Sequence, residues 1–132
     1  MNSSSGRPLF VYGTLMFPEI IGSLLGRVPE SRPAIARGFE VRRIHGVSSP
    51  GMVAVEGGSA HGLLLDDLDD HELGVLDEYE DDFYRRVGLV VHDDGGARQA
   101  MSYVVGGDVV MAIEWTPRWF ESVHLSDFVG TL

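Results

Sequence analysis

The chain opens with a short apolar run that ends in a glycine and is followed by an amphipathic stretch. Residues 9–12 read Leu-Phe-Val-Tyr and stop at Gly13, which is the pattern of a short buried strand. Pro18 is well placed as the first residue of a helix that runs to about Leu25 and ends at Gly26. The start of the domain is therefore predicted to be a strand, a glycine turn and a helix.

The middle of the chain alternates strand-like runs with turn residues. Strands broken by glycine and proline are predicted over residues 34–55, with strong turn chemistry at 48–51. Residues 52–55 form an apolar run typical of a strand, and the glycine-rich segment 56–59 is predicted to be a hairpin turn. A further short apolar strand is expected over 62–65.

A second helix is predicted after the strand at 62–65, where the chain becomes acidic. Asp69 or Asp70 can cap this helix, and Glu72 in its first turn suits the helix dipole. Positions three, four and seven apart align on one face of a helix. That face carries Leu73, Leu76 and Tyr79 or Glu80.

The last third of the chain returns to strands and ends in an amphipathic segment. Apolar residues alternate over 87–91, turn residues occupy 93–96, and 99–105 is predicted to run back as the partner strand of a hairpin. A short amphipathic helix with aromatic residues is expected over 116–128. About six or seven strands and two or three short helices favour an α+β domain with a curled sheet or barrel.

Length and composition indicate one folded domain. The chain has 132 residues, 44% of them apolar, and no internal repeat or linker. Residues 1–8 are predicted to be a disordered polar tail and 9–132 a single domain. No apolar run approaches the roughly 18–20 residues that cross a bilayer. We expect a cytoplasmic protein, and no feature of the sequence indicates an oligomeric state.

The charge and the absence of cysteine exclude several function classes. A net charge of −10 repels phosphate backbones, so nucleic acid and anionic membrane surfaces are poor candidates as partners. Acidic residues concentrate between Asp66 and Asp82, a pattern typical of a solvated helix with its flanks. Without cysteine there are no disulfides, thiolate nucleophiles or thiolate metal ligands.

Glu80 is the strongest candidate for acid/base chemistry. A helix that continues to this residue places its carboxylate on the apolar face with Leu76. Desolvation, the neighbouring charges at 81–82 and the helix C-terminus would all raise its pKa, as a general acid/base requires. The alternative is that the helix ends at Glu78. Glu80 is then a solvated loop residue or pairs with an arginine at 85–86.

The turn at Tyr12-Gly13-Thr14-Leu15 is a second candidate site. A glycine turn between a strand and a helix exposes successive backbone N–H groups, which can hold a carboxylate or an oxyanion. The alternative is an ordinary tight turn.

Other chemistries are poorly supported, and we expect neither a metal nor a cofactor. The five histidines lack the spacing of metal ligands, and residues 66–70 lack the glycine and terminal glutamate of a calcium loop. Ser48, Ser49 and Ser102 lack a nucleophile-elbow context. Trp115 and Trp119 are better interpreted as packing residues than as a ligand cage.

In combination these motifs resemble the γ-glutamyl cyclotransferase-like superfamily. Residues 9–15 are similar to its amino-terminal signature, and 76–80 with Tyr84 and Arg86 to its second signature. The middle strands at 50–52 and 62–64 also match. The carboxyl end, 114–128, resembles the avirulence-induced-gene-like (γ-glutamylamine cyclotransferase-like) branch. Tyr79 departs mildly from the phenylalanine that relatives often carry, a change expected to preserve packing.

The resemblance implies a small mixed β-barrel with a pocket between the glycine loop and Glu80. It implies that Glu80 is the catalytic acid/base and that the loop residues Tyr12, Gly13, Thr14 and Leu15 bind a γ-glutamyl group largely through their backbone. By the same comparison Tyr103 is a pocket wall, and so is Tyr84.

The reaction implied by the resemblance is cyclisation of a γ-glutamyl amide or γ-glutamyl amine. The products are 5-oxoproline and a free amine, and the reaction needs no cofactor. Two alternatives are a non-catalytic binding or regulatory module with the same pocket, and amide hydrolysis by the same carboxylate and a water.

Overall fold

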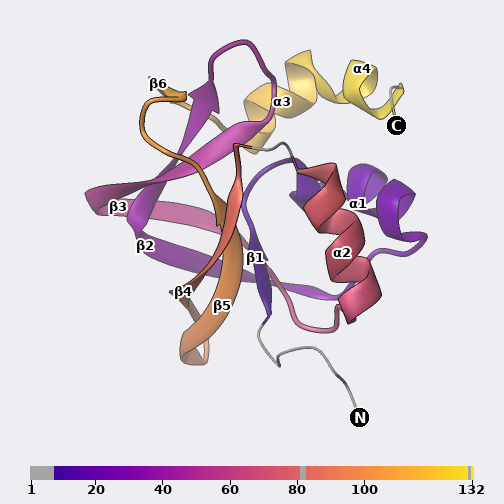
Figure 1. Cartoon of the computed structure of the whole chain (residues 1–132), viewed down its shortest axis with the longest axis horizontal. Helices are drawn as coiled ribbons and strands as arrows, with labels where there is room; N and C mark the ends of the chain where they lie inside the picture. Colours follow the sequence, from indigo (N-terminus) through magenta and orange to yellow (C-terminus); the bar gives the residue numbers. More distant parts are fainter. Residues whose placement is uncertain (1–7, 81–82, 131) are drawn as a thin grey trace.

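The computed structural model describes residues 8–80, 83–130 and 132, so the predicted tail lies outside the described residues except for Pro8. The described strands and helices are arranged as a barrel with helices packed outside it (Figure 1). The strands are β1 (Leu9–Val11), β2 (Ser31–Ile44), β3 (Pro50–Leu65), β4 (Arg85–Asp93), β5 (Gly96–Val104) and β6 (Val110–Glu114). The helices are the 3₁₀ turn η1 (Thr14–Met16), α1 (Pro18–Leu25), α2 (Asp70–Tyr79), α3 (Pro117–Val123) and α4 (Leu125–Gly130).

The sheet closes because β2 and β3 pair with each other. The strand order is β3-β1-β5-β4-β2-β6, and the additional β3–β2 pairing joins the first five strands into a ring with β6 outside it. β1 runs antiparallel to β3 and parallel to β5, so the barrel is mixed. This confirms the predicted α+β fold with a small mixed β-barrel. The described part of the chain holds more helical segments than the two or three predicted.

The predicted hairpin turn at 56–59 is wrong. These residues lie inside β3, which runs without interruption from Pro50 to Leu65. Arg37 faces Ser59 and Phe39 faces Ala54, so residues 55–58 of β3 stand opposite Gly38 alone. Turns and bulges use the same glycine-rich chemistry, and here the extra residues bend one long hairpin as a β-bulge does. The chain reverses instead at residues 45–49.

The two helices predicted from local signals are confirmed. α1 begins at Pro18, and Gly26 ends it in the left-handed conformation with φ 75°. α2 is capped by the Asp69 side chain, which accepts from the Glu72 N–H while the Glu72 side chain accepts from the Asp69 N–H. α1 and α2 lie side by side on one flank of the barrel (Figure 1).

The carboxyl-terminal region differs in detail from the prediction. The single helix expected over 116–128 is two helices, α3 and α4, which meet at His124. The predicted hairpin is confirmed, with Asp93 opposite Gly96. β6 is a strand that the sequence analysis did not assign, and it pairs with β2 outside the closed ring. Trp115 is buried and packs against Phe120, in agreement with its prediction as a packing residue.

Alternation along β1 separates two of the clusters that make up the core. Leu9 and Val11 face the helices and belong to a cluster that includes Ile20, Leu76 and Phe120. Phe10 points the other way, into a second cluster inside the barrel, because successive side chains of a strand lie on opposite faces. The second cluster also contains Ala34, Ala36, Met52, Leu64, Val91 and Ala100. β1 therefore connects the barrel to the helical layer.

The helices of the described residues are all short. None of them combines the length and the apolar character that crossing a membrane requires.

Candidate active site

One hollow on the surface brings together every site residue predicted from the sequence. It encloses ≈ 290 Å³, including its open mouth. Its lining residues are Phe10, Val11, Tyr12, Gly13, Thr14, Leu15, Ser49, Pro50, Glu80, Tyr84 and Tyr103. The walls thus come from β1 and the segment after it, the start of β3, the end of α2, the segment before β4 and the end of β5. A hollow lined by aromatic rings and a few polar groups suits a small ligand.

Tyr12 links strands of the barrel through hydrogen bonds of its hydroxyl group. Its hydroxyl donates to the Tyr103 carbonyl at 2.8 Å and accepts from the Met52 N–H at 3.2 Å. Burial, and then the nearby negative charge of Glu80, raise the pKa of the Tyr12 phenol far above its ordinary value. The phenol therefore stays neutral and holds three strands in place around the pocket.

Gly13 lets the loop run close to the start of β3. A Cβ added at this position would lie 2.5 Å from Pro50 Cγ and 2.9 Å from Pro50 Cδ. No side chain fits there without a shift of the loop or of the proline. The close approach brings the two walls formed by Gly13 and Pro50 together.

Thr14 and Tyr79 tie the loop to the end of α2. Their hydroxyl oxygens are 2.9 Å apart, and Tyr79 packs edge-on against Phe128 of α4 with ring centroids 6.4 Å apart. Thr14 and Leu15 are buried in the 3₁₀ turn η1. The first N–H groups of such a turn have no partner within the turn itself. Tyr79 therefore does more than preserve packing, because its hydroxyl makes a contact that phenylalanine lacks.

Glu80 reaches the pocket from just beyond the helix. α2 ends at Tyr79, and Glu80 has extended backbone angles while its N–H still bonds to the Leu76 carbonyl at 3.2 Å. The helix therefore stops one residue short of the predicted continuation, yet the side chain is half-buried and lines the hollow. Arg86, one of the two arginines considered as partners of Glu80, lies 3.4 Å from Asp77.

Asp77 is a polar neighbour of the pocket to which the sequence analysis gave no role. Its Oδ1 accepts from the Tyr103 hydroxyl at 2.6 Å, and its Oδ2 lies 3.4 Å from Arg86 Nη2. Burial first, and then the hydrogen bond and charge of Asp77 and the charge of Glu80, raise the pKa of the Tyr103 phenol. Nothing local in the sequence indicates this contact, because Tyr103 comes from β5.

Tyr84 joins two walls of the pocket. Its hydroxyl donates to the Pro50 carbonyl, and its ring lies 4.8 Å from that of Phe83, centroid to centroid. Ser49 and Pro50 also line the hollow, and the sequence analysis gave neither of them a place in the pocket. Nothing local in the sequence places that turn next to Gly13.

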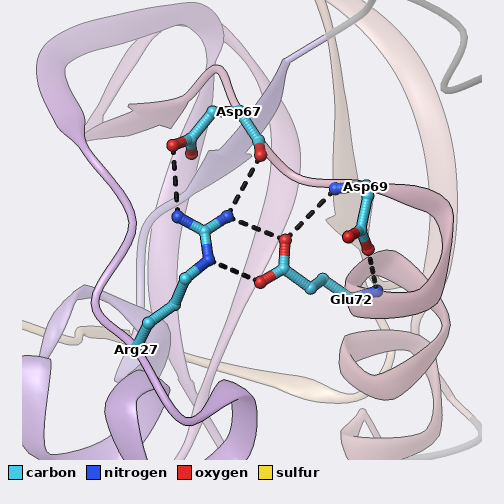
Figure 2. A network of polar contacts seen from close by, with 4 residues as sticks. All are labelled: Arg27, Asp67, Asp69 and Glu72. Atoms are coloured by element: carbon cyan, nitrogen blue, oxygen red, sulfur yellow. Dashed lines mark hydrogen bonds and ion pairs between the residues drawn. The ribbon is translucent and has the colours of Figure 1, made fainter. Parts of the chain in front are cut away.

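The far end of α2 is fixed by an ion-pair network (Figure 2). The Arg27 guanidinium donates to the two carboxylate oxygens of Glu72 at 2.6 and 2.7 Å, and to the Asp67 carboxylate at 3.1 Å. The hydrogen bond from Arg27, against the opposing effect of burial, lowers the pKa of Glu72. This network anchors the start of the helix whose other end carries Glu80.

Metal ligation has no visible basis in the part of the chain that the structure describes. No three histidine, aspartate or glutamate side chains of those residues are grouped as ligands of one ion would be.

Comparison with known proteins gives a consistent family. Residues 9–119 match the family model described as "Gamma-glutamyl cyclotransferase, AIG2-like". "AIG2-like protein A" of Arabidopsis thaliana is 32% identical over 127 residues, which cover 93% of this chain and 77% of the relative. A protein of Methanocaldococcus jannaschii described as a gamma-glutamylcyclotransferase and putative RNase is 34% identical over 97 residues. That match covers 71% of this chain and 44% of the archaeal protein.

Solved structures have the same fold. A solution structure of an Arabidopsis thaliana protein superposes with a TM-score of 0.75 and 24% identity, over 99% of this chain and 82% of the other. A structure described as "Gamma-glutamyl cyclotransferase" gives a TM-score of 0.64 with 14% identity, over 95% and 85% of the two chains. At these identities the similarity establishes the fold.

Proposed function

Since this chain belongs to the γ-glutamyl cyclotransferase, AIG2-like family, we propose that it cyclises a γ-glutamyl amide or γ-glutamyl amine to 5-oxoproline and releases the free amine. One observation carries the proposal: a half-buried carboxylate, Glu80, lines the same small hollow as the glycine loop after β1. The archaeal relative described as a gamma-glutamylcyclotransferase supports the reaction class.

The proposed chemistry needs one group that first accepts and then donates a proton. The substrate's α-nitrogen attacks its own γ-carbonyl carbon, a C–N bond forms, and a five-membered ring closes. The bond from that carbon to the leaving nitrogen then breaks. Overall, two protons leave the α-nitrogen and the released amine gains them. Glu80 is the group proposed to carry these protons in turn.

The remaining walls are proposed to position the substrate. Backbone N–H groups at Thr14 and Leu15 can hold the substrate carboxylate or the oxyanion that develops on the γ-carbonyl. The nucleophile is tethered to its target, so folding the substrate into the reactive conformer supplies much of the rate. Gly13 brings this loop against Pro50.

The test is release of 5-oxoproline from a panel of γ-glutamyl amino acids and γ-glutamyl amines. We expect turnover by the wild-type protein and a loss of about 10²–10⁴-fold in Glu80→Gln, since the amide cannot accept or donate the proton. Glu78→Gln is the matched control, because Glu78 is an exposed glutamate near the end of the same helix. It should keep wild-type activity.

Three results would contradict the proposal in different ways. Undiminished activity in Glu80→Gln would remove this residue from its role. Release of glutamate in place of 5-oxoproline would indicate hydrolysis by an activated water. Ligand binding without any turnover would indicate a binding module that retains the pocket.

A further inference from the structure

The three tyrosines of the pocket wall each donate their hydroxyl proton to a protein oxygen. Tyr12 donates to the Tyr103 carbonyl, Tyr84 to the Pro50 carbonyl, and Tyr103 to the Asp77 carboxylate. A phenol has one proton to give. These side chains therefore offer a ligand lone pairs and no proton, so the polar part of this wall favours a ligand group that donates hydrogen bonds.

Tyr103 contributes to this wall a phenol oxygen that keeps lone pairs after donating its proton. The Tyr12 oxygen already accepts from the Met52 N–H, whereas the Tyr103 hydroxyl makes its short bond to Asp77 at 2.6 Å. Tyr103 is 4% exposed and lines the hollow together with Glu80. Glu80 is close enough for its charge to raise the pKa of the Tyr103 phenol. Two acceptors, one of them a carboxylate, thus share this side of the pocket.

Asp77 sets the direction of the Tyr103 proton. Its two oxygens contact two residues that face each other across β4 and β5, because Arg86 is directly opposite Tyr103 in that pair. Residues opposite each other in an antiparallel pair lie on the same face of the sheet. The carboxylate is therefore held between a guanidinium and the phenol, with one oxygen toward each.

We propose that Asp77 is a positioning residue. By taking the Tyr103 proton it makes the Tyr103 oxygen, together with Glu80, an acceptor site for the α-ammonium group of the substrate. This inference deepens the proposed function and rests on it. An ammonium group has three donors and no acceptor, so an acceptor-only wall recognises it and gives no equivalent partner to a ligand without it. Without Asp77, the Tyr103 hydroxyl could point its hydrogen into the pocket, where it would repel the ammonium group.

The experiment compares two ligands that differ only in this group. L-glutamate and glutarate are titrated calorimetrically into the wild-type protein, Asp77→Ala and Asp77→Asn. The wild type is expected to prefer L-glutamate. Asp77→Ala should lose about tenfold of that preference while its affinity for glutarate is unchanged, as expected for one hydrogen bond to a charged group. Asp77→Asn keeps an acceptor oxygen for Tyr103 and should retain most of the preference.

A double variant separates positioning from a general effect on folding. Tyr103→Phe removes the acceptor itself, so Asp77→Ala in that background should cause no further loss of preference. Unchanged glutarate binding is the internal evidence that the pocket is folded. Three results would each overturn the inference. Asp77→Ala could lose affinity for both ligands equally, or the two substitutions could reduce the preference additively in the double variant. The wild type could also show no preference for L-glutamate.

The outcome is distinguishable from failure of the proposed function, because binding is measured without turnover. If no 5-oxoproline is released but the preference for L-glutamate depends on Asp77, the proposed reaction is contradicted and the ammonium site is supported. If 5-oxoproline is released but the wild type does not prefer L-glutamate to glutarate, the proposed reaction is supported and the role of Asp77 is contradicted.

Discussion

The two ends of α2 are held by different kinds of contact. At its start, Glu72 receives two hydrogen bonds from Arg27 and completes a capping box with Asp69. At its end, Tyr79 shares a hydroxyl contact with Thr14, and Glu80 lines a hollow. The first end is fixed by charge pairs between neighbouring loops, and the second by contacts to β1 and its loop.

The contrast is clearest between two glutamates of the same helix region. Glu72 has a lowered pKa because Arg27 donates to it, so it stays deprotonated near neutral pH and is a poor proton donor. Glu80 stands in the wall of the pocket beside two buried phenols. The same residue type thus serves stability at one end and is proposed to serve chemistry at the other, according to its surroundings. Changes at the start should alter stability, and changes at the end should alter activity.

After Glu80→Gln, the largest effect is expected where the glycine loop meets the start of β3. Gly13→Ala places a Cβ 2.5 Å from Pro50 Cγ and must shift the loop. A displacement of this kind should lower kcat/KM for 5-oxoproline release by about 100-fold. Gly74→Ala is the control, because a Cβ there meets nothing within 4 Å. It should leave the rate unchanged and stabilise α2, and full activity in Gly13→Ala would contradict the proposed loop geometry.

At the start of α2 the effect should fall on stability alone. Asp69→Ala removes the cap on the Glu72 N–H and should lower the free energy of unfolding by about 1 kcal/mol, measured by urea denaturation. Asp69→Asn keeps a capping oxygen and should lose little. A fall in kcat at temperatures where Asp69→Ala is still folded would mean that the two ends are coupled.

A smaller, pH-dependent change is expected from Glu72. A carboxyl whose pKa is lowered on folding adds stability above its unfolded pKa of about 4.3, and this stability is lost as the pH falls toward the folded value. Glu72→Gln should therefore be less stable than the wild type near neutral pH. The difference should shrink in acid, and the urea midpoint measured as a function of pH tests this. Glu78→Gln, at an exposed position of the same helix, is the control for removal of one acidic residue.

The smallest effect is expected from a single hydroxyl at the end of the helix. Tyr79→Phe keeps the edge-on contact with Phe128 and removes the contact to Thr14. We expect a loss of stability of about 0.5 kcal/mol, typical of one partly buried hydrogen bond. The activity change should exceed that of Asp69→Ala when both are assayed at the same temperature. The reverse order would break the division of roles between the two ends.

Local signals were enough to predict the helices that flank the pocket. Pro18 and Gly26 mark the ends of α1, and the cap at Asp69 marks the start of α2, because each acts within a few residues of itself. The last turn of α2 was less certain, since periodicity does not decide between Glu78 and Glu80 as its end.

Features that depend on distant strands were beyond sequence reasoning. The bulge in β3 uses turn residues, but only the pairing of β2 with β3 keeps the chain extended there. Asp77 has no local signal for its role, since its partner Tyr103 comes from β5. The shared pocket of Tyr12, Tyr84 and Tyr103 was expected from the family resemblance, and spacing alone did not predict it.

The closed barrel also sets an order for biosynthesis. Among the described strands, β1 leaves the ribosome before the others. Yet the Tyr12 hydroxyl bonds to a carbonyl 91 positions later, and the Ser102 hydroxyl bonds to the Phe10 carbonyl over a separation of 92. The strand next to the glycine loop therefore cannot complete these contacts until most of the chain has been synthesised. Contacts this distant in sequence form slowly. Until β5 emerges, the nascent chain carries an incomplete sheet with an open edge that a chaperone or a second chain could meet.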